Sequence, residues 1–335
     1  MIKATFYTDP FYGNNRQFDL SDPVANRDNC LYPAWCLKEE FRRHGIDLST
    51  QDIHPPHKSA FVIYNEMPPS FRDEGAQRRY LIILECEAIR PANWIMARHR
   101  HFEKIFTWHD RFVDNQKYFK VNFTVKMPDP RDIPTDEKNK FCAMIVTQKY
   151  APHPQELYTE RVKAVRWFEG NHPDEFDLYG MGWDRYVFKG FMKKFNKLTP
   201  LTKLLKPRFP SYRGTVSHKK DVLKQYRFAI CYENARGFPG YITEKIFDCF
   251  AAGCVPVYWG PPNVTDHIPP GTFIDRQRFE DYEGLYAYLK NMPPEEYEGY
   301  QKNIRGALES QVFAPFSAEY FASTIVDEVL KTEGR

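Results

Sequence analysis

The chain has 335 residues, of which 42% are hydrophobic and 16% aromatic, and this is enough for about two domains with buried cores. Its net charge of +3 is close to balance and argues against a dedicated nucleic-acid-binding protein. No apolar run approaches the roughly 18 residues of a membrane-spanning helix, and no apolar leader follows Met1, so we expect a soluble, cytoplasmic protein.

The seven cysteines are odd in number and lack the spacing of a metal site. Several lie in apolar runs, which indicates buried, reduced thiols and agrees with a cytosolic protein. On this interpretation the glycosylation sequons at Asn122 and Asn263 are chance matches. The cysteines are Cys30, Cys36, Cys86, Cys142, Cys231, Cys249 and Cys254.

The first half of the chain alternates strand and helix patterns. Residues 33–45 predict a helix, because a proline stands near the start and a glycine at the end. Apolar runs of strand length are typical of buried parallel sheets. Such runs occupy residues 2–8, 60–66, 80–87 and 103–110. We expect this first domain to cover residues 1–149.

The second half repeats the alternation and predicts a further domain at 150–312. Helices are expected at 156–170, 243–252 and 279–292, and strands at 143–147, 176–183, 227–233, 254–260 and 271–275. Two successive alternations predict two α/β domains with parallel sheets, which bind ligands at the carboxyl ends of their strands. Residues 313–335 contain a last amphipathic helix.

The segment ENARGFPGYITEKIFDCF, residues 233–250, joins a predicted strand to a predicted helix. Thr243 suits the N-cap position, which places Glu244 and Lys245 in the first helical turn. Backbone N–H groups and the helix dipole favour an anion there, whereas a lysine opposes the dipole unless an anion binds between them. We therefore interpret Lys245 as a phosphate ligand and Glu244 as an acceptor for sugar hydroxyls.

Other polar positions in this segment support a nucleotide-sugar site. Gly237 and Gly240 allow close approach of the backbone, and Asn234 can bind a base or ribose edge. The alternative is a polar loop whose lysine and glutamate are simply solvated.

A longer stretch resembles a known family. The sequence at residues 226–264, YRFAICYENARGFPGYITEKIFDCFAAGCVPVYWGPPNV, resembles the signature of glycosyltransferase family 10, the α1,3-fucosyltransferases. The resemblance extends more loosely over 156–279 and weakly through the first 140 residues. It implies a GT-B fold, in which two Rossmann-like domains with parallel sheets face each other across a cleft.

The resemblance also implies an activity and a set of site residues. Family members bind an acceptor glycan in the N-terminal domain and GDP-fucose in the C-terminal domain, and they transfer L-fucose to a sugar hydroxyl with inversion. The C-terminal helix of a GT-B protein crosses back to the first domain. The positions implied in donor binding are Arg161, Asn234, Tyr241, Glu244 and Lys245, with the helix N-terminus at Thr243.

Inverting transfer also needs a base for the attacking hydroxyl. Glu85 and Glu87 follow an apolar run, and strand alternation would put both on one face, where two nearby carboxylates raise one pKa. The resemblance implies a catalytic glutamate after such a strand. Glu85 matches it best, and Glu87 remains an alternative.

No paired-acid motif stands at a predicted strand end, and the histidines fit no zinc spacing. Lys245, Arg161 and the helix N-terminus can together stabilise the leaving GDP. We therefore expect neither a cofactor nor a metal.

A basic stretch interrupts the second domain. Residues 187–198 put phenylalanines and a leucine on one helical face and lysines on the other, the pattern of an interfacial helix. We expect possible peripheral membrane contact through 187–206, with a mobile flap or an ordinary surface helix as alternatives. Membrane contact would suit a lipid-linked glycan acceptor.

The leading hypothesis is thus a fucosyltransferase of protein-glycan or lipopolysaccharide biosynthesis. Alternatives are a transferase that uses another GDP-6-deoxysugar or makes another linkage, and a catalytically silent glycan- or nucleotide-binding protein. The sequence does not identify the acceptor.

Overall fold

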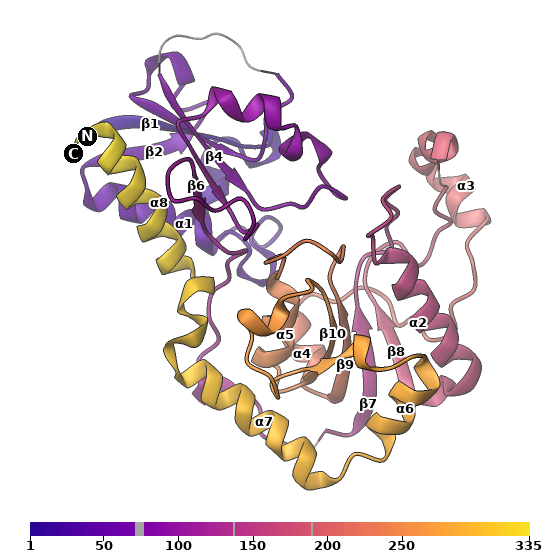
Figure 1. The fold of residues 1–335 in the computed structure, drawn as a ribbon. Helices are drawn as coiled ribbons and strands as arrows, with labels where there is room; N and C mark the ends of the chain where they lie inside the picture. Colours follow the sequence, from indigo (N-terminus) through magenta and orange to yellow (C-terminus); the bar gives the residue numbers. More distant parts are fainter. Residues whose placement is uncertain (71–76, 137, 189) are drawn as a thin grey trace. The chain divides into compact units, whose positions relative to one another are not determined.

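The computed structural model describes residues 1–70, 77–136, 138–188 and 190–335, which form two compact units (Figure 1). The first division between them falls after Met127 instead of the expected Lys149, because strand β7 (Lys140–Ile145) pairs with strands of the second sheet. Unit 1 comprises Met1–Met127, Phe238–Glu244 and Val312–Arg335, and unit 2 comprises Pro128–Gly237 and Lys245–Gln311.

Unit 1 contains a six-stranded sheet in the order β2-β1-β3-β4-β5-β6, and all its strand pairs are parallel. Its strands are β1 (Ile2–Tyr7), β2 (Ile46–Thr50), β3 (Phe61–Asn65), β4 (Arg78–Ile83), β5 (Lys104–Thr107) and β6 (Tyr118–Lys120). Its α-helices are α1 (Tyr32–Arg43) and α8 (Ala318–Glu333).

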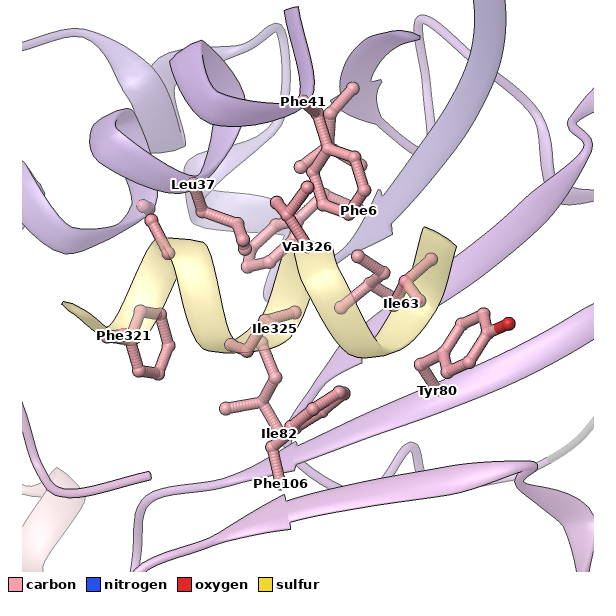
Figure 2. Close-up of a cluster of buried hydrophobic side chains, with 14 of the residues drawn as sticks. Phe6, Leu37, Phe41, Ile63, Tyr80, Ile82, Phe106, Phe321, Ile325 and Val326 are labelled. Atoms are coloured by element: carbon pink, nitrogen blue, oxygen red, sulfur yellow. The ribbon is translucent and has the colours of Figure 1, made fainter. Parts of the chain in front are cut away.

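The core of unit 1 lies on both faces of this sheet. Alternate residues of β3 and β4 belong to different clusters, with Ile63 and Ile82 in one and Val62 and Leu81 in the other, because successive strand residues point to opposite faces. Figure 2 shows Ile325 of α8 among apolar side chains of the sheet and of α1. The C-terminal helix is therefore part of the core of unit 1.

Unit 2 contains a five-stranded parallel sheet in the order β11-β10-β9-β7-β8. Besides β7, its strands are β8 (Phe176–Tyr179), β9 (Tyr226–Tyr232), β10 (Val255–Trp259) and β11 (Ile274–Asp275). The remaining α-helices are α2 (Tyr158–Asn171), α3 (Thr199–Leu204), α4 (Lys219–Leu223), α5 (Glu244–Ala251), α6 (Tyr282–Lys290) and α7 (Pro294–Glu309). Glu244 groups with unit 1 and the rest of α5 with unit 2.

The predicted strand at 80–87 is too long. Strand β4 ends at Ile83, and Glu85 and Glu87 lie in the bend and turn that follow. The N–H groups of Leu84 and Glu85 donate to the Glu66 carboxylate, at 3.0 and 2.9 Å, which takes this segment out of the strand. The argument that Glu85 and Glu87 share one strand face is therefore wrong.

The basic segment is not one amphipathic helix. A 3₁₀ helix (Gly190–Lys197) is followed by the short helix α3, and Leu198 separates them. Lys189 and the side chains of Phe191 and Lys193 lie outside the described part of the chain. No helix that the structure describes is both long enough and apolar enough to cross a bilayer.

Candidate active site

Several site residues of unit 2 meet at the carboxyl end of β9. Asn234 follows this strand, and Arg161 reaches it from α2. The Arg161 side chain is 3% exposed, and its Nη2 donates to the Tyr232 carbonyl at 2.7 Å and to Asn234 Oδ1 at 3.1 Å. The structure therefore brings two sequence-predicted donor-binding residues together, although 73 positions separate them.

Lys245 lies at the same end of the sheet, in the first turn of α5. Its Nζ is 3.0 Å from Glu233 Oε2, and Tyr258 donates to Glu233 Oε1 at 3.1 Å. The Glu233 side chain is fully buried, whereas that of Lys245 is 18% exposed. This carboxylate holds the ammonium group in place, because a buried charge needs a partner and hydrogen bonds.

Sequence reasoning missed Glu233, which appeared only as the last residue of a predicted strand. The available signal was the acid itself, because a carboxylate directly after a buried parallel strand stands at the ligand-binding edge of the sheet.

Arg276 was also missed. It follows β11 and is 7% exposed, with its guanidinium 4.5 Å from the Tyr282 ring centroid and 5.7 Å from that of Trp259. The exposed Arg236 guanidinium is 5.2 Å from the same Trp259 ring. The carboxyl edge of this sheet is thus rich in cations, which favours an anionic ligand.

Thr243 and Glu244 lie where the sequence predicts. Thr243 is buried and directly precedes α5, at the N-cap position, and Glu244 is the partly exposed first residue of the helix. The start of α5 therefore combines a helix N-terminus with Lys245, and both attract anions.

Tyr241 and Gly240 belong to unit 1 by their contacts. The Tyr241 side chain is 0% exposed, its ring lies 4.7 Å from that of Trp108, and its hydroxyl donates to Glu85 Oε2 at 3.3 Å. Gly240 has a φ of +86°, and a Cβ there would collide with the Trp108 carbonyl. The sequence predicted that another group approaches Gly240 closely, and that group is the backbone of Trp108.

The two candidate bases have different surroundings. Glu85 is partly buried and accepts from Tyr241, and its peptide accepts from the Trp94 indole at 3.1 Å. Glu87 is exposed and has no hydrogen bond to any residue that the structure describes. Only Glu85 is held in a defined position.

Aromatic rings pack around His109 in unit 1. Trp94, Trp108 and Phe112 all pack around His109, with ring centroids 4.8 to 5.3 Å from its imidazole. Burial lowers the pKa of His109 to about 4, and its Nδ1 has no hydrogen-bond partner among the described residues. The ring is therefore neutral near pH 7 and serves as part of the aromatic packing.

Among the described residues, no group of three or more histidine, cysteine or acidic side chains is arranged to hold a metal ion.

Comparison with protein families gives a match at residues 190–307 to glycosyltransferase family 10 (fucosyltransferase), C-terminal part. This region contains β9, Glu233, Asn234 and Lys245. The match falls on the segment that resembles this family by sequence. The family predicted from residues 226–264 is confirmed.

The matches cover a third or less of the length of the curated relatives. An α-(1,3)-fucosyltransferase of Helicobacter pylori is 37% identical over 163 residues, which cover 43% of this chain and 33% of the relative. An α-(1,4)-fucosyltransferase of Arabidopsis thaliana is 36% identical over 75 residues, or 22% of this chain and 18% of the relative. The human GDP-fucose protein O-fucosyltransferase 3 is 32% identical over 94 residues, or 27% and 19%.

Solved structures extend the likeness to the whole fold. An α1,3-fucosyltransferase with GDP-fucose has a TM-score of 0.54 at 16% identity, over 97% of this chain and 89% of that one. The Anabaena protein Alr3699/HepE, in complex with UDP and glucose, has a TM-score of 0.58 at 9% identity, over 99% and 100%. With two parallel-sheet α/β units, the predicted GT-B fold class is confirmed.

Proposed function

We propose that this protein transfers L-fucose from GDP-fucose to a glycan hydroxyl. The observation that carries the proposal is the meeting of Arg161, Asn234 and Lys245 at the carboxyl end of β9, within the family 10 unit. The relatives named above act as fucosyltransferases, and a cation-rich sheet edge suits a nucleoside diphosphate.

Donor binding follows from the charges in unit 2. Lys245 and the N-terminus of α5 bind the diphosphate, and Arg161 adds a second cation close to Asn234. Glu244 accepts hydrogen bonds from sugar hydroxyls, and Asn234 binds the ribose or base. These groups stabilise the charge that develops on GDP as it leaves.

The transfer is an inverting single displacement with Glu85 as the base. The acceptor oxygen bonds to C1 of fucose while the bond from C1 to the GDP oxygen breaks, and the hydroxyl proton passes to Glu85. The hydrogen bond from Tyr241 and the partial burial of Glu85 support this role. Tyr241 then acts beside the base and not as a donor ligand.

Transfer proceeds without a metal or other cofactor. Lys245, Arg161 and the start of α5 supply the positive charge that a divalent cation provides in other nucleotide-sugar enzymes.

The proposed linkage is α1,3, which is the linkage in the name of the 37% identical relative. Other linkages and protein-bound acceptors remain alternatives, because the relatives include an α-(1,4)-fucosyltransferase and a protein O-fucosyltransferase. Another GDP-6-deoxysugar remains an alternative donor, because such sugars present the same GDP to the site.

Acceptor-dependent release of GDP tests the proposal. The purified chain is incubated with GDP-fucose, alone and with lactosamine-type or lipopolysaccharide-type glycans, and GDP and the product linkage are measured. We expect rapid release only with an acceptor. GDP binding without acceptor-dependent release would instead support a silent nucleotide-binding protein.

We further propose peripheral contact with the cytoplasmic face of an anionic membrane through 187–206. This stretch has six lysines and no acid, and it exposes Leu198 (50%) and Leu204 (81%) beside them. Buried thiols in the chain suit the same reducing compartment.

Vesicle sedimentation tests the membrane proposal. We expect binding to vesicles that contain phosphatidylglycerol and weaker binding after replacement of Lys194, Lys197 and Lys203 by glutamine. Replacing three exposed lysines elsewhere, Lys58, Lys302 and Lys331, is the matched control. Equal binding by both variants and the parent would count against this surface.

A further inference from the structure

Glu66 is a buried carboxylate for which the proposed chemistry has given no role. It directly follows β3, its side chain is 7% exposed, and its backbone has a φ of +75°. The other described non-glycine residues with positive φ are all Asn or Asp, which tolerate this conformation better than glutamate. An unusual backbone conformation thus places a carboxylate inside unit 1.

Three groups donate hydrogen bonds to this carboxylate. Oε1 accepts from the N–H groups of Leu84, at 3.0 Å, and Glu85, at 2.9 Å, and Oε2 accepts from Asn93 Nδ2. Among the described residues these three donors, and no lysine or arginine, bind the Glu66 carboxylate. Three donors converge on two oxygens, and together they hold the side chain in one position.

The carbonyl groups of the same two residues are also held. The Trp108 indole donates to the Leu84 carbonyl at 2.8 Å, and the Glu85 carbonyl accepts from Trp94 at 3.1 Å and Asn93 at 3.2 Å. All four backbone polar groups of Leu84 and Glu85 are therefore fixed by partners distant in sequence. The Glu85 side chain starts from a rigid peptide.

We propose that Glu66 is a positioning residue for Glu85: by accepting the N–H groups of Leu84 and Glu85, it orients the peptide that carries the Glu85 side chain. The inference rests on the proposed role of Glu85 as base. A general base must lie within hydrogen-bond reach of the proton that it accepts, so the orientation of its peptide matters.

The electrostatic surroundings agree with this role. Burial raises the pKa of Glu66 to about 7, and the charge of Glu85 contributes in the same direction, against the Asn93 and backbone hydrogen bonds. Its folded-state pKa is above the unfolded value, so electrostatic stability is highest below that value and falls as pH rises towards 7. Ionised Glu66 therefore costs stability near neutral pH, which is typical of a functional carboxylate.

The other titratable groups near Glu66 and Glu85 either bind other carbonyl groups or are neutral. Arg90 and Arg98 donate to the carbonyls of Met67 and Pro68 instead of to Glu66. Burial raises the pKa of the Cys86 thiol to about 12 and lowers that of His99, so both are neutral near pH 7. The neighbouring groups are Glu85, Cys86, Glu87, Arg90, Arg98 and His99.

The test compares kcat and KM in three variants. Glu66→Gln keeps the shape but replaces one carboxylate oxygen by an amide NH₂ group, so we expect kcat to fall about 10-fold or more. Glu66→Asp shortens the side chain by one methylene and should lower kcat, because its carboxylate no longer reaches both N–H groups. Trp94→Phe removes a donor to the Glu85 carbonyl and should also lower kcat, although it changes the packing on His109 as well.

The KM for GDP-fucose, and GDP affinity measured by calorimetry, should be unchanged in all three variants. Unchanged kcat in Glu66→Gln would overturn the inference alone. If that variant does not fold, full kcat in Glu66→Asp would overturn it. Full activity of Glu85→Gln would overturn it together with the base assignment, and a parent without acceptor-dependent turnover would refute the proposed function itself.

Discussion

At the scale of single residues, Glu233 and Lys245 form the charge pair on which the proposed donor site depends. A fully buried carboxylate and a largely buried ammonium lie 3.0 Å apart at the end of β9. Such a pair adds little net stability, because desolvation offsets the attraction, but it fixes both side chains in position. We therefore interpret Glu233 as the residue that presents Lys245 to an anion.

A double-mutant experiment distinguishes the role of Glu233, which holds Lys245, from the role of Lys245, which binds phosphate. Lys245→Met should weaken GDP binding about 10- to 100-fold, while guanosine binding stays unchanged, because a charge-assisted contact to phosphate is lost. It should also lower the free energy of unfolding by roughly 3 kcal/mol, since Glu233 loses its ammonium partner. Adding Glu233→Gln should restore stability but not affinity. Calorimetry and urea unfolding measure the two effects, and undiminished GDP affinity in Lys245→Met would contradict the phosphate role.

The second residue-scale prediction distinguishes the two candidate bases. Glu85→Gln should lower kcat by ~10²-fold or more with GDP affinity intact, because the proton acceptor is lost while unit 2 is unchanged. Glu87→Gln is the matched control and should retain the parent kcat, since Glu87 is exposed. Steady-state kinetics with saturating acceptor decide the question, and the reverse pattern would assign the base to Glu87.

At the scale of elements, the end of β4 decides the geometry around Glu85. The apolar run continues past Ile83, but the next two N–H groups donate to the Glu66 carboxylate. The strand therefore ends at Ile83. A strand would have pointed Glu85 and Glu87 in the same direction. The bend instead leaves Glu87 exposed and Glu85 beside Tyr241.

Helix α8 contributes to the stability of unit 1 although it lies at the far end of the sequence. Ile325 is 0% exposed and packs in the cluster that includes α1 and the sheet. Ile325→Ala should lower the free energy of unfolding by about 2–5 kcal/mol through lost burial and a cavity. Urea denaturation measures the change. Asp327→Ala on the exposed face of the same helix should change it by less than about 0.5 kcal/mol, and equal effects would argue against this packing.

At the scale of the whole molecule, the chain combines a cation-rich unit 2, which contains most of the family 10 match, with a unit 1 that holds a candidate base. In the proposed mechanism, unit 2 binds the donor and unit 1 provides the proton acceptor. Neither half-site includes a recognisable metal cluster among the described residues.

Activity in the presence of a chelator tests the metal-free mechanism. Acceptor-dependent GDP release should be the same before and after prolonged incubation with EDTA, because Lys245 and Arg161 supply the positive charge. The parent protein without chelator is the control. Loss of activity that Mn²⁺ restores would refute metal independence.

Much of this protein follows from its sequence because the deciding interactions are local. Apolar runs alternating with amphipathic stretches predict two parallel sheets, and the order of Asn234, Thr243, Glu244 and Lys245 along one strand–loop–helix segment predicts a nucleotide-sugar site. These positions are close in the chain, so backbone geometry alone brings them together. The family signature lies in the same segment.

Only the tertiary structure decided the surroundings of Glu85. Its partner Tyr241 is 156 positions away, and Glu66, Trp94 and Trp108 come from three other segments of unit 1. Periodicity along a strand carries no information about such partners, because hydrogen bonds between distant segments form only when the sheet assembles. The same long-range contacts ended β4 early and grouped residues 238–244 with unit 1, against expectations drawn from the sequence.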